Sequence, residues 1–150
     1  LADPAPGRWK EVVPEAPHAN QGFLPVGGRL LVHYLRDVTS RIQLFSPEGK
    51  PLGELPVPAA GSVSALQGRW ERDEVVFSFS SYTILRSTYR ADVGTREVKE
   101  WWRPEVPFDA APFETRQVWV RSKDGTRVPM FVTHRRDLKL EGSHPALLFR

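Results

Sequence analysis

Cysteine is absent from this chain of 150 residues. Its absence excludes disulfide scaffolds, thiolate zinc sites and cysteine nucleophiles, although it does not identify the cellular compartment. Long apolar runs are also missing, since no stretch approaches the roughly 18 residues that a membrane-spanning helix needs, and we expect no membrane partner. Residues 1–7 lack a basic stretch followed by an apolar core, so they do not resemble a signal peptide and are expected to be an internal starting point.

The chain also lacks a strong excess of either positive or negative charge. The chain has 21 basic and 18 acidic residues, a formal net charge of +3, and the two signs are interspersed. Segments that bind nucleic acids contain blocks of lysine and arginine. The densest basic pair beside an apolar strand is Arg135-Arg136, which we expect in a solvated turn. Nucleic acid is therefore not an expected partner.

The sequence also lacks the motifs that mark an active site. It has no G-x-S-x-G, the sharp turn that exposes the nucleophile of α/β-hydrolases, because Gly61-Ser62 and Gly142-Ser143 have the wrong spacing. No glycine-rich phosphate loop is present. No histidine stands at metal-ligand spacing from another or beside a recognisable nucleophile, and structural roles are expected for all four: His18, His33, His134 and His144. We therefore assign no catalytic, cofactor-binding or metal-binding residue to this chain and expect no cofactor.

Carboxylates and tryptophans give no functional assignment either. Paired carboxylates that cleave glycosides must face each other across a substrate, and nothing in the sequence brings a pair together. Charged, solvated loops are the interpretation for Glu71, Asp73, Glu74, Glu97 and Glu100. Tryptophans can form stacking platforms for nucleic acids, but these are spread over separate segments. We expect core and sheet-packing roles for Trp9, Trp70, Trp101, Trp102 and Trp119.

What the chain does contain is a series of short apolar segments separated by turn residues. Fourteen prolines and eleven glycines favour strands and turns over long helices. Period-two alternation, as in Arg41-Ile-Gln-Leu-Phe45, is typical of a strand. Polar residues predict loops at 15–21 and 67–73. The expected strands cover residues 9–14, 23–24, 29–35, 41–45, 52–57, 62–66, 75–79, 87–92, 98–102, 115–122, 127–134 and 146–149.

The strands between residues 23 and 102 form two similar groups of four. Leu31-Val-His-Tyr34 corresponds to Val75-Val-Phe-Ser78, and Gly49 and Gly94 stand in corresponding turns about 45 residues apart. Four short antiparallel strands at this spacing are typical of β-propeller blades, and a β-sandwich of the same strands is equally compatible. A blade buries its faces only against neighbouring blades, so two blades leave two apolar faces uncovered.

The character of the sequence changes after Pro104. Three prolines in residues 104–112 predict an extended linker. Asp124-Gly125 predicts the tight turn of a hairpin between residues 115–122 and 127–134. Ala146-Leu-Leu-Phe149 does not alternate, as expected of a strand that is covered on both sides. A hairpin followed by such a strand resembles the opening of an α/β-hydrolase sheet.

Several segments resemble, in the same order, those of the prolyl oligopeptidase family of serine peptidases. The most specific is Ser122-Lys-Asp-Gly-Thr126 with Val128-Pro-Met-Phe131, followed by Gly142-Ser-His-Pro145. Earlier segments that fit the family are Trp9-Lys-Glu-Val-Val-Pro-Glu15, Tyr34-Leu-Arg-Asp-Val38, Gly61-Ser-Val63, Phe77-Ser-Phe-Ser-Ser81 and Thr88-Tyr-Arg-Ala-Asp92. Together they cover nearly all of the chain.

The resemblance implies a mainly β fragment of a two-domain enzyme. Residues 1–107 would be the last blades of a seven-bladed β-propeller, with residues 9–14 from the blade before, and residues 108–150 the first strands of the α/β-hydrolase catalytic domain. The enzyme would be a serine endopeptidase that cleaves short peptides on the C-terminal side of proline, with the propeller limiting substrate size. Its serine, histidine and aspartate would lie outside this chain, so the chain alone is expected to be inactive.

Two alternatives remain open at this point. One is a non-enzymatic β-rich binding module, and the other is a related oligopeptidase with a different specificity, such as a preference for basic residues. For the peptidase, the expected partners are an oligopeptide substrate and the remainder of the enzyme, which is needed to complete the fold. The cytoplasm is the expected compartment, with the periplasm as the alternative.

Overall fold

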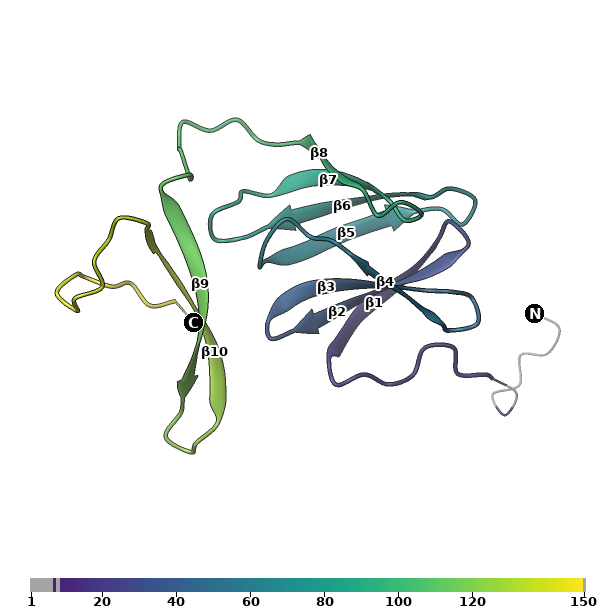
Figure 1. Cartoon of the computed structure of the whole chain (residues 1–150), viewed down its shortest axis with the longest axis horizontal. Helices are drawn as coiled ribbons and strands as arrows, with labels where there is room; N and C mark the ends of the chain where they lie inside the picture. Colours follow the sequence, from purple (N-terminus) through teal and green to yellow (C-terminus); the bar gives the residue numbers. More distant parts are fainter. Residues whose placement is uncertain (1–6, 8, 150) are drawn as a thin grey trace. The chain divides into compact units, whose positions relative to one another are not determined.

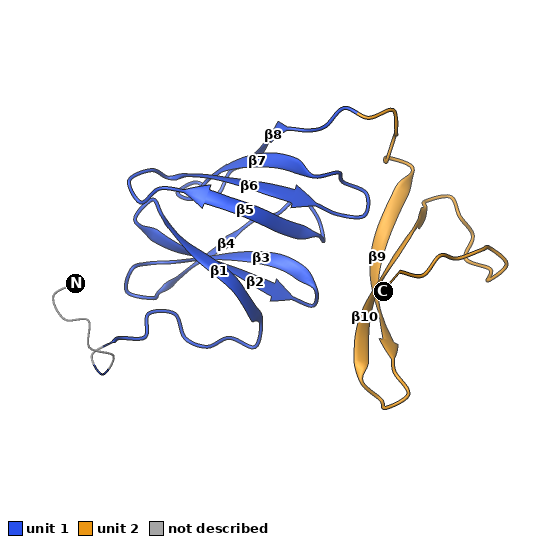
Figure 2. Cartoon of the chain, turned by 180° about the vertical axis from the view of Figure 1, so that it is seen from behind, with its two compact units in different colours: residues 1–105 blue, residues 106–150 orange. Residues whose placement is uncertain are grey.

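The structure is a computed structural model that describes residue 7 and residues 9–149. The chain divides into two compact units, residues 1–105 and 106–150 (Figure 2). The described part contains strands and no α-helix, which confirms the mainly β class. Among these residues no helix is long and apolar enough to cross a bilayer. The expectation about the N-terminal start falls mostly on residues outside the described part.

Unit 1 consists of two four-stranded antiparallel sheets (Figure 1). In both sheets each strand pairs with the next strand in the sequence, so the connections are short turns. The first sheet contains β1 (Ala19–Val26), β2 (Arg29–Arg36), β3 (Thr39–Phe45) and β4 (Pro51–Leu55). The second contains β5 (Ser62–Gly68), β6 (Glu74–Ser80), β7 (Ser87–Asp92) and β8 (Val98–Trp102). The two predicted groups of four strands are confirmed.

The core of unit 1 lies between the two sheets. Along β6 every second side chain is fully buried, namely Val75, Phe77 and Phe79, because successive side chains of a strand point to opposite faces. Leu31 and Ile42 of the first sheet belong to the same buried cluster. Burying one side chain of this size contributes about 1.5–3 kcal/mol, so the shared core holds the two sheets together.

Hydrogen bonds also join the two sheets at one end of the core. The Ser40 N–H donates to the Gly61 carbonyl at 2.9 Å, and the Val63 N–H donates to the Ser40 hydroxyl oxygen at 2.8 Å. Ser40 is 2% exposed. These contacts satisfy backbone groups that burial would otherwise leave without partners.

The other face of the first sheet is covered by the segment that precedes it. Val13 and Ala16 pack on Val32, Tyr34 and Phe45. Residues 9–14 form no strand, so that prediction was wrong. An apolar segment forms a strand only where a neighbouring strand can accept its backbone hydrogen bonds, and in the described chain this segment has none.

Several predicted boundaries in unit 1 also differ from the structure, and the largest differences are in β1, β4 and β5. β1 begins at Ala19, inside the expected loop 15–21, and β5 continues to Gly68, inside the expected loop 67–73. β4 covers Pro51–Leu55 and not residues 52–57. β1 and β5 contain register shifts, between Asn20 and Gly22 and between Ser64 and Gln67. Bulges extend a ladder through residues that break the apolar alternation, so the pattern underestimated both strands.

Unit 2 contains one antiparallel hairpin, as predicted. It pairs β9 (Phe113–Arg121) with β10 (Arg127–Arg135) around the turn at residues 122–126. Gly125 has a φ of 85°, and the Asp124 carboxylate accepts the Thr126 N–H at 3.0 Å. Asp-Gly therefore closes the hairpin, but within a loop of five residues in which only Gly125 has a positive φ, and not as a two-residue turn with positive φ at both positions.

The expected strand at residues 146–149 is not formed. Leu147, Leu148 and Phe149 are 80%, 77% and 82% exposed. A buried strand needs paired neighbours and cover on both faces, and the described part of unit 2 supplies only a hairpin. The observed units meet between residues 105 and 106, whereas the prediction placed a domain boundary between 107 and 108. The identity of the two predicted domains stays a prediction.

Candidate functional site

Two places in the described chain combine features of a site, one in each unit. The first is a groove of about 500 Å³ on the face of the first sheet that points away from the core of unit 1. Its walls come from residues 13–18 and from β1 and β2, and they include Val13, Phe23, Val32 and Tyr34. None of the described lining residues is a serine, threonine or cysteine. The groove therefore offers mainly apolar surface and no serine, threonine or cysteine nucleophile among its described lining residues.

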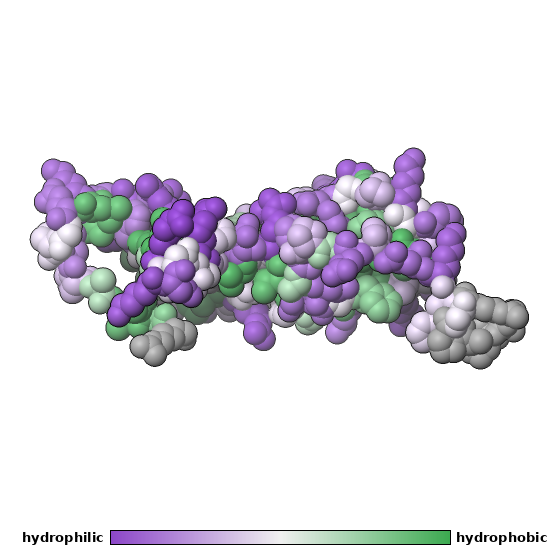
Figure 3. All heavy atoms as spheres, turned by 90° about the horizontal axis from the view of Figure 1, so that it is seen from below, coloured by the Kyte–Doolittle hydropathy of each residue, from purple (hydrophilic) through white to green (hydrophobic). Residues whose placement is uncertain are grey.

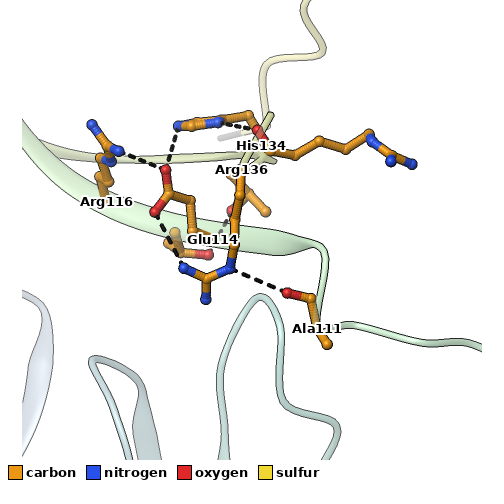
Figure 4. Close-up of polar contacts among 8 residues, drawn as sticks. Ala111, Glu114, Arg116, His134 and Arg136 are labelled. Carbon is orange, nitrogen blue, oxygen red and sulfur yellow. Dashed lines mark hydrogen bonds and ion pairs between the residues drawn. The ribbon is translucent and has the colours of Figure 1, made fainter. Parts of the chain in front are cut away.

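The second place is a charged cluster at the open end of the β9–β10 hairpin (Figure 4). The Glu114 carboxylate lies at its centre, with Arg116 at 2.6 Å on Oε1 and Arg136 at 3.6 Å from Oε2. Nε2 of His134 lies 3.6 Å from Oε1. One carboxylate thus faces three nitrogen-bearing side chains.

His134 is held rigidly in this cluster. Its side chain is 7% exposed, and Nδ1 donates a hydrogen bond to the Arg135 carbonyl at 2.8 Å. Nε2 is buried without a hydrogen-bond partner and is directed at Glu114. A ring with Nδ1–H has a hydrogen on Nε2 only when it is charged, so the contact with Glu114 is an ion pair only in that form. Within the described residues no set of three His, Cys, Asp or Glu side chains could hold a metal ion.

The other histidines lie apart from this cluster. His33 lies on β2, and its Nε2 is 2.8 Å from the Ser40 hydroxyl oxygen. Burial lowers the pKa of His33. His18 lines the groove, whereas His144 is exposed and makes none of the hydrogen bonds found in the described chain, so the structural role expected for His144 is not seen there.

The carboxylates singled out in the sequence mostly pair with cations and not with each other. Asp73 contacts Arg29 at 2.8 Å, and Glu97 contacts Lys99 at 2.9 Å. The carboxylate of Glu100 receives Arg103 at 2.8 Å and the Tyr89 hydroxyl at 3.3 Å. The hydrogen bond from Arg103 lowers the pKa of Glu100, while burial and then the charge of Glu100 raise the pKa of Tyr89. A pair of carboxylates that could work as acid and base is not formed by these residues.

The prediction that tryptophans pack in the core was wrong for this chain, whereas their predicted role in packing sheets against neighbouring blades stays a prediction. Trp9, Trp101 and Trp102 are more than half exposed, and Trp70 and Trp119 are 45% and 43% exposed. β8, which carries Trp101 and Trp102, and β9, which carries Trp119, contain no buried residue, so these rings have no core to enter. Trp119 instead stacks under the Arg127 guanidinium, 4.6 Å from the ring centre.

Sequence reasoning missed the Glu114 cluster and treated Arg135-Arg136 as a solvated turn. Both arginines are more than half exposed, but Arg136 also contacts Glu114 and donates to the Ala111 carbonyl at 3.1 Å. The predicted hairpin already contained the information that brings Glu114 and His134 together. A turn centred on Asp124-Gly125 fixes the register and pairs Glu114 with His134 across the strands.

Comparison with known proteins identifies the family. Residues 1–103 match the N-terminal β-propeller domain of prolyl oligopeptidase. The prolyl endopeptidase of Elizabethkingia miricola is 26% identical over 152 residues, covering 99% of this chain and 21% of that protein. An uncharacterised peptidase of Sinorhizobium fredii, y4nA, is 34% identical over 155 residues with the same coverage. The chain thus spans about a fifth of the length of these curated relatives.

Solved structures agree with this result. A chain from a structural and mechanistic study of two prolyl endopeptidases aligns with a TM-score of 0.80 and 40% identity, over 92% of this chain and 20% of that chain. The apo form of prolyl oligopeptidase B from Galerina marginata aligns with a TM-score of 0.74 and 25% identity, over 87% and 19%. Of the two architectures compatible with the strands, these matches support the propeller and not the sandwich.

Proposed function

The chain belongs to the prolyl oligopeptidase family, and on this premise we propose that it is part of a serine endopeptidase that cleaves short peptides on the C-terminal side of proline. The observation that carries the proposal is the match of residues 1–103 to the family's propeller domain, with similarity to prolyl endopeptidases over 99% of the chain. Oligopeptides are the proposed substrate and the cytoplasm the proposed compartment.

In this proposal unit 1 forms the last two blades of a seven-bladed propeller. The groove on the first sheet supports it, because a cavity of about 500 Å³ lined by Val13, Phe23, Val32 and Tyr34 is poorly covered by residues 13–18 alone. A preceding blade would cover the same face with a whole sheet. Apolar side chains also reach the surface in patches on the face shown in Figure 3.

Unit 2 is proposed to open the α/β-hydrolase domain. The exposed side chains of Leu147, Leu148 and Phe149 support this, since an unalternating apolar segment acquires strand structure where neighbouring strands pair with it on both sides. The catalytic serine, histidine and aspartate would then belong to the sequence beyond these strands. The chain itself would contribute to the enclosure that restricts substrates to short peptides.

The test is a hydrolysis assay of the full-length protein that contains this chain. We expect cleavage of a short peptide with a reporter after proline, and much slower cleavage of a peptide of the same composition with alanine in place of the proline. A serine-directed phosphonate should label one serine, which mass spectrometry should place outside residues 1–150. Labelling of a serine within these residues, or hydrolysis by the 150-residue chain alone, would contradict the proposal.

The same assay separates the proposal from its alternatives. Cleavage after lysine or arginine, without cleavage after proline, would identify the related oligopeptidase with basic specificity. The absence of both hydrolysis and labelling would favour a non-enzymatic binding module.

A further inference from the structure

The connection between β8 and β9, residues 103–112, has two parts that differ in their hydrogen bonds. In the first part, residues 104–107, both Pro104 and Pro107 lack an N–H, and in the described chain no residue of this part donates a hydrogen bond. The Val106 carbonyl accepts the Phe108 N–H at 2.8 Å, a bond between neighbours that does not reach the hairpin. The second part, residues 108–112, is internally bonded. The Ala111 N–H donates to the Asp109 carboxylate at 2.9 Å, and the Phe113 N–H donates to the Ala110 carbonyl at 3.0 Å.

Arg136 fastens this second part to the hairpin. Its backbone N–H donates to the Pro112 carbonyl at 2.8 Å, and its Nε donates to the Ala111 carbonyl at 3.1 Å. The remainder of the guanidinium faces Glu114, with Nη1 3.6 Å from Oε2. The side chain of Arg136 is therefore held between a carboxylate of β9 and a carbonyl of the connection (Figure 4).

Glu114 orients Arg136 by its charge. The Glu114 side chain is 20% exposed, and besides Arg136 it faces Arg116 and the buried imidazole of His134. Without the negative charge of Glu114, the positive charges of Arg116 and Arg136 would lie beside the His134 ring with no carboxylate to neutralise them. The Arg136 side chain is 64% exposed. Without the carboxylate it can turn into solvent, because water solvates the guanidinium and few buried contacts are lost.

We infer that Glu114 and Arg136 form a clamp that fixes residues 108–112 to the β9–β10 hairpin. The clamp leaves residues 104–107 as the part of the connection in which the chain can bend. This role is independent of the peptidase activity proposed above, because it concerns only contacts within unit 2.

Hydrogen exchange of the whole chain, measured for single amides by NMR, tests the clamp. Glu114→Gln and Arg136→Gln should each raise the exchange rate of the Ala111, Phe113 and Arg136 amides by about tenfold, the scale of a local opening. Arg116→Gln is the matched control. It removes a cation from the same carboxylate but has no hydrogen bond to the connection, so these amides should exchange as in the parent chain.

Limited proteolysis gives a second, independent measurement. In Glu114→Gln, chymotrypsin should cleave after Phe108 faster than in the parent chain, while glutamyl endopeptidase should cleave after Glu105 at an unchanged rate. Equal acceleration at both bonds, or exchange in Glu114→Gln and Arg136→Gln that matches Arg116→Gln, would overturn the inference. If Glu114→Gln melts the entire hairpin, seen as faster exchange at the Gly125 amide in the turn, Arg136→Gln decides between the two outcomes.

Discussion

Adjacent glycines in the β1–β2 turn make different contacts. Gly27 and Gly28 have φ angles of 55° and 65°, the positive values that a two-residue hairpin turn requires at both positions. A Cβ on Gly27 would lie 2.8 Å from Val93 and 3.0 Å from the backbone of Asp73, whereas a Cβ on Gly28 would meet nothing within 4 Å. Gly27 is thus required by both the turn and the packing of the second sheet, and Gly28 by the turn alone.

Alanine substitutions should separate these two requirements. Gly28→Ala should lower the free energy of unfolding by about 1–2 kcal/mol, the cost of a left-handed alanine. Gly27→Ala should lose a further ~1–3 kcal/mol through overpacking against Val93 and Asp73. Urea unfolding of the whole chain measures both. Equal losses in the two variants would show that the close approach at Gly27 does not limit packing.

His33 gives unit 1 a dependence on pH. Ser40 accepts the Val63 N–H, so its own hydroxyl hydrogen is available to Nε2 of His33, which accepts it only when the ring is neutral. Burial lowers the pKa of His33 in the folded state below 6.5. The unfolded chain therefore binds more protons, and stability rises with pH across this range.

The contribution of His33 to the free energy of unfolding should be fully present above pH 6.5 and should be lost as the pH falls through the folded-state pKa. His33→Gln should remove this part of the loss, because glutamine does not titrate. Urea midpoints at pH 7.5, 6.5 and 5.5 provide the measurement, in a range above the ordinary pKa values of the carboxyl groups. The same decline in both proteins would exclude His33 as its cause.

At the scale of the elements, the edges of both sheets in unit 1 are irregular. In the first sheet the register shifts between Asn20 and Gly22 and again between Leu44 and Phe45. The second sheet has corresponding shifts in its β5–β6 and β7–β8 ladders. Bulges at edge strands hinder pairing with another chain. Both sheets are therefore better suited to pack against another sheet through their faces than to pair with another strand at their edges.

The β7–β8 turn depends on a single carboxylate. Oδ1 of Asp92 accepts the N–H of Gly94 at 2.9 Å and the N–H of Thr95 at 2.7 Å. The backbone hydrogen bond from Thr95 lowers the pKa of Asp92. Asp92→Ala should lower the free energy of unfolding by about 1 kcal/mol, the net value of such bonds near the surface. Asp92→Asn keeps an acceptor and should recover part of it.

Amide exchange of Gly94 and Thr95 checks this prediction locally. Both amides should exchange faster in Asp92→Ala than in Asp92→Asn. No difference between the two variants would mean that the turn is held by its backbone bonds, from Arg96 to the Asp92 carbonyl and from Asp92 to the Glu97 carbonyl.

At the scale of the whole molecule, large apolar side chains lie on the surface of both units. Phe23 is 71% exposed beside the groove, and Phe149 is 82% exposed in unit 2. Monomeric soluble proteins rarely expose wide apolar patches. If the chain is produced by itself, we expect it to self-associate.

Sedimentation velocity over a range of concentrations tests this expectation. Phe23→Ser should shift the distribution toward monomer without a large loss of stability, since the side chain is mostly exposed. Lys50→Ser, at an exposed residue of the turn before β4, is the control and should leave the distribution unchanged. A chain that stays monomeric at all concentrations would contradict the proposal that neighbouring blades cover these faces.

The sequence by itself determined the features that depend on neighbours along the chain. Alternation placed Ile42 and Leu44 on one face of β3, and Asp124-Gly125 fixed the hairpin and its register. The tertiary structure decided what depends on distant segments: residues 9–14 and 146–149 have strand-like sequences but no paired neighbour in the described chain. The same holds for Glu114, whose three partners meet only after the hairpin closes. Local patterns record turns and alternation, whereas pairing and cover are supplied by other parts of the chain.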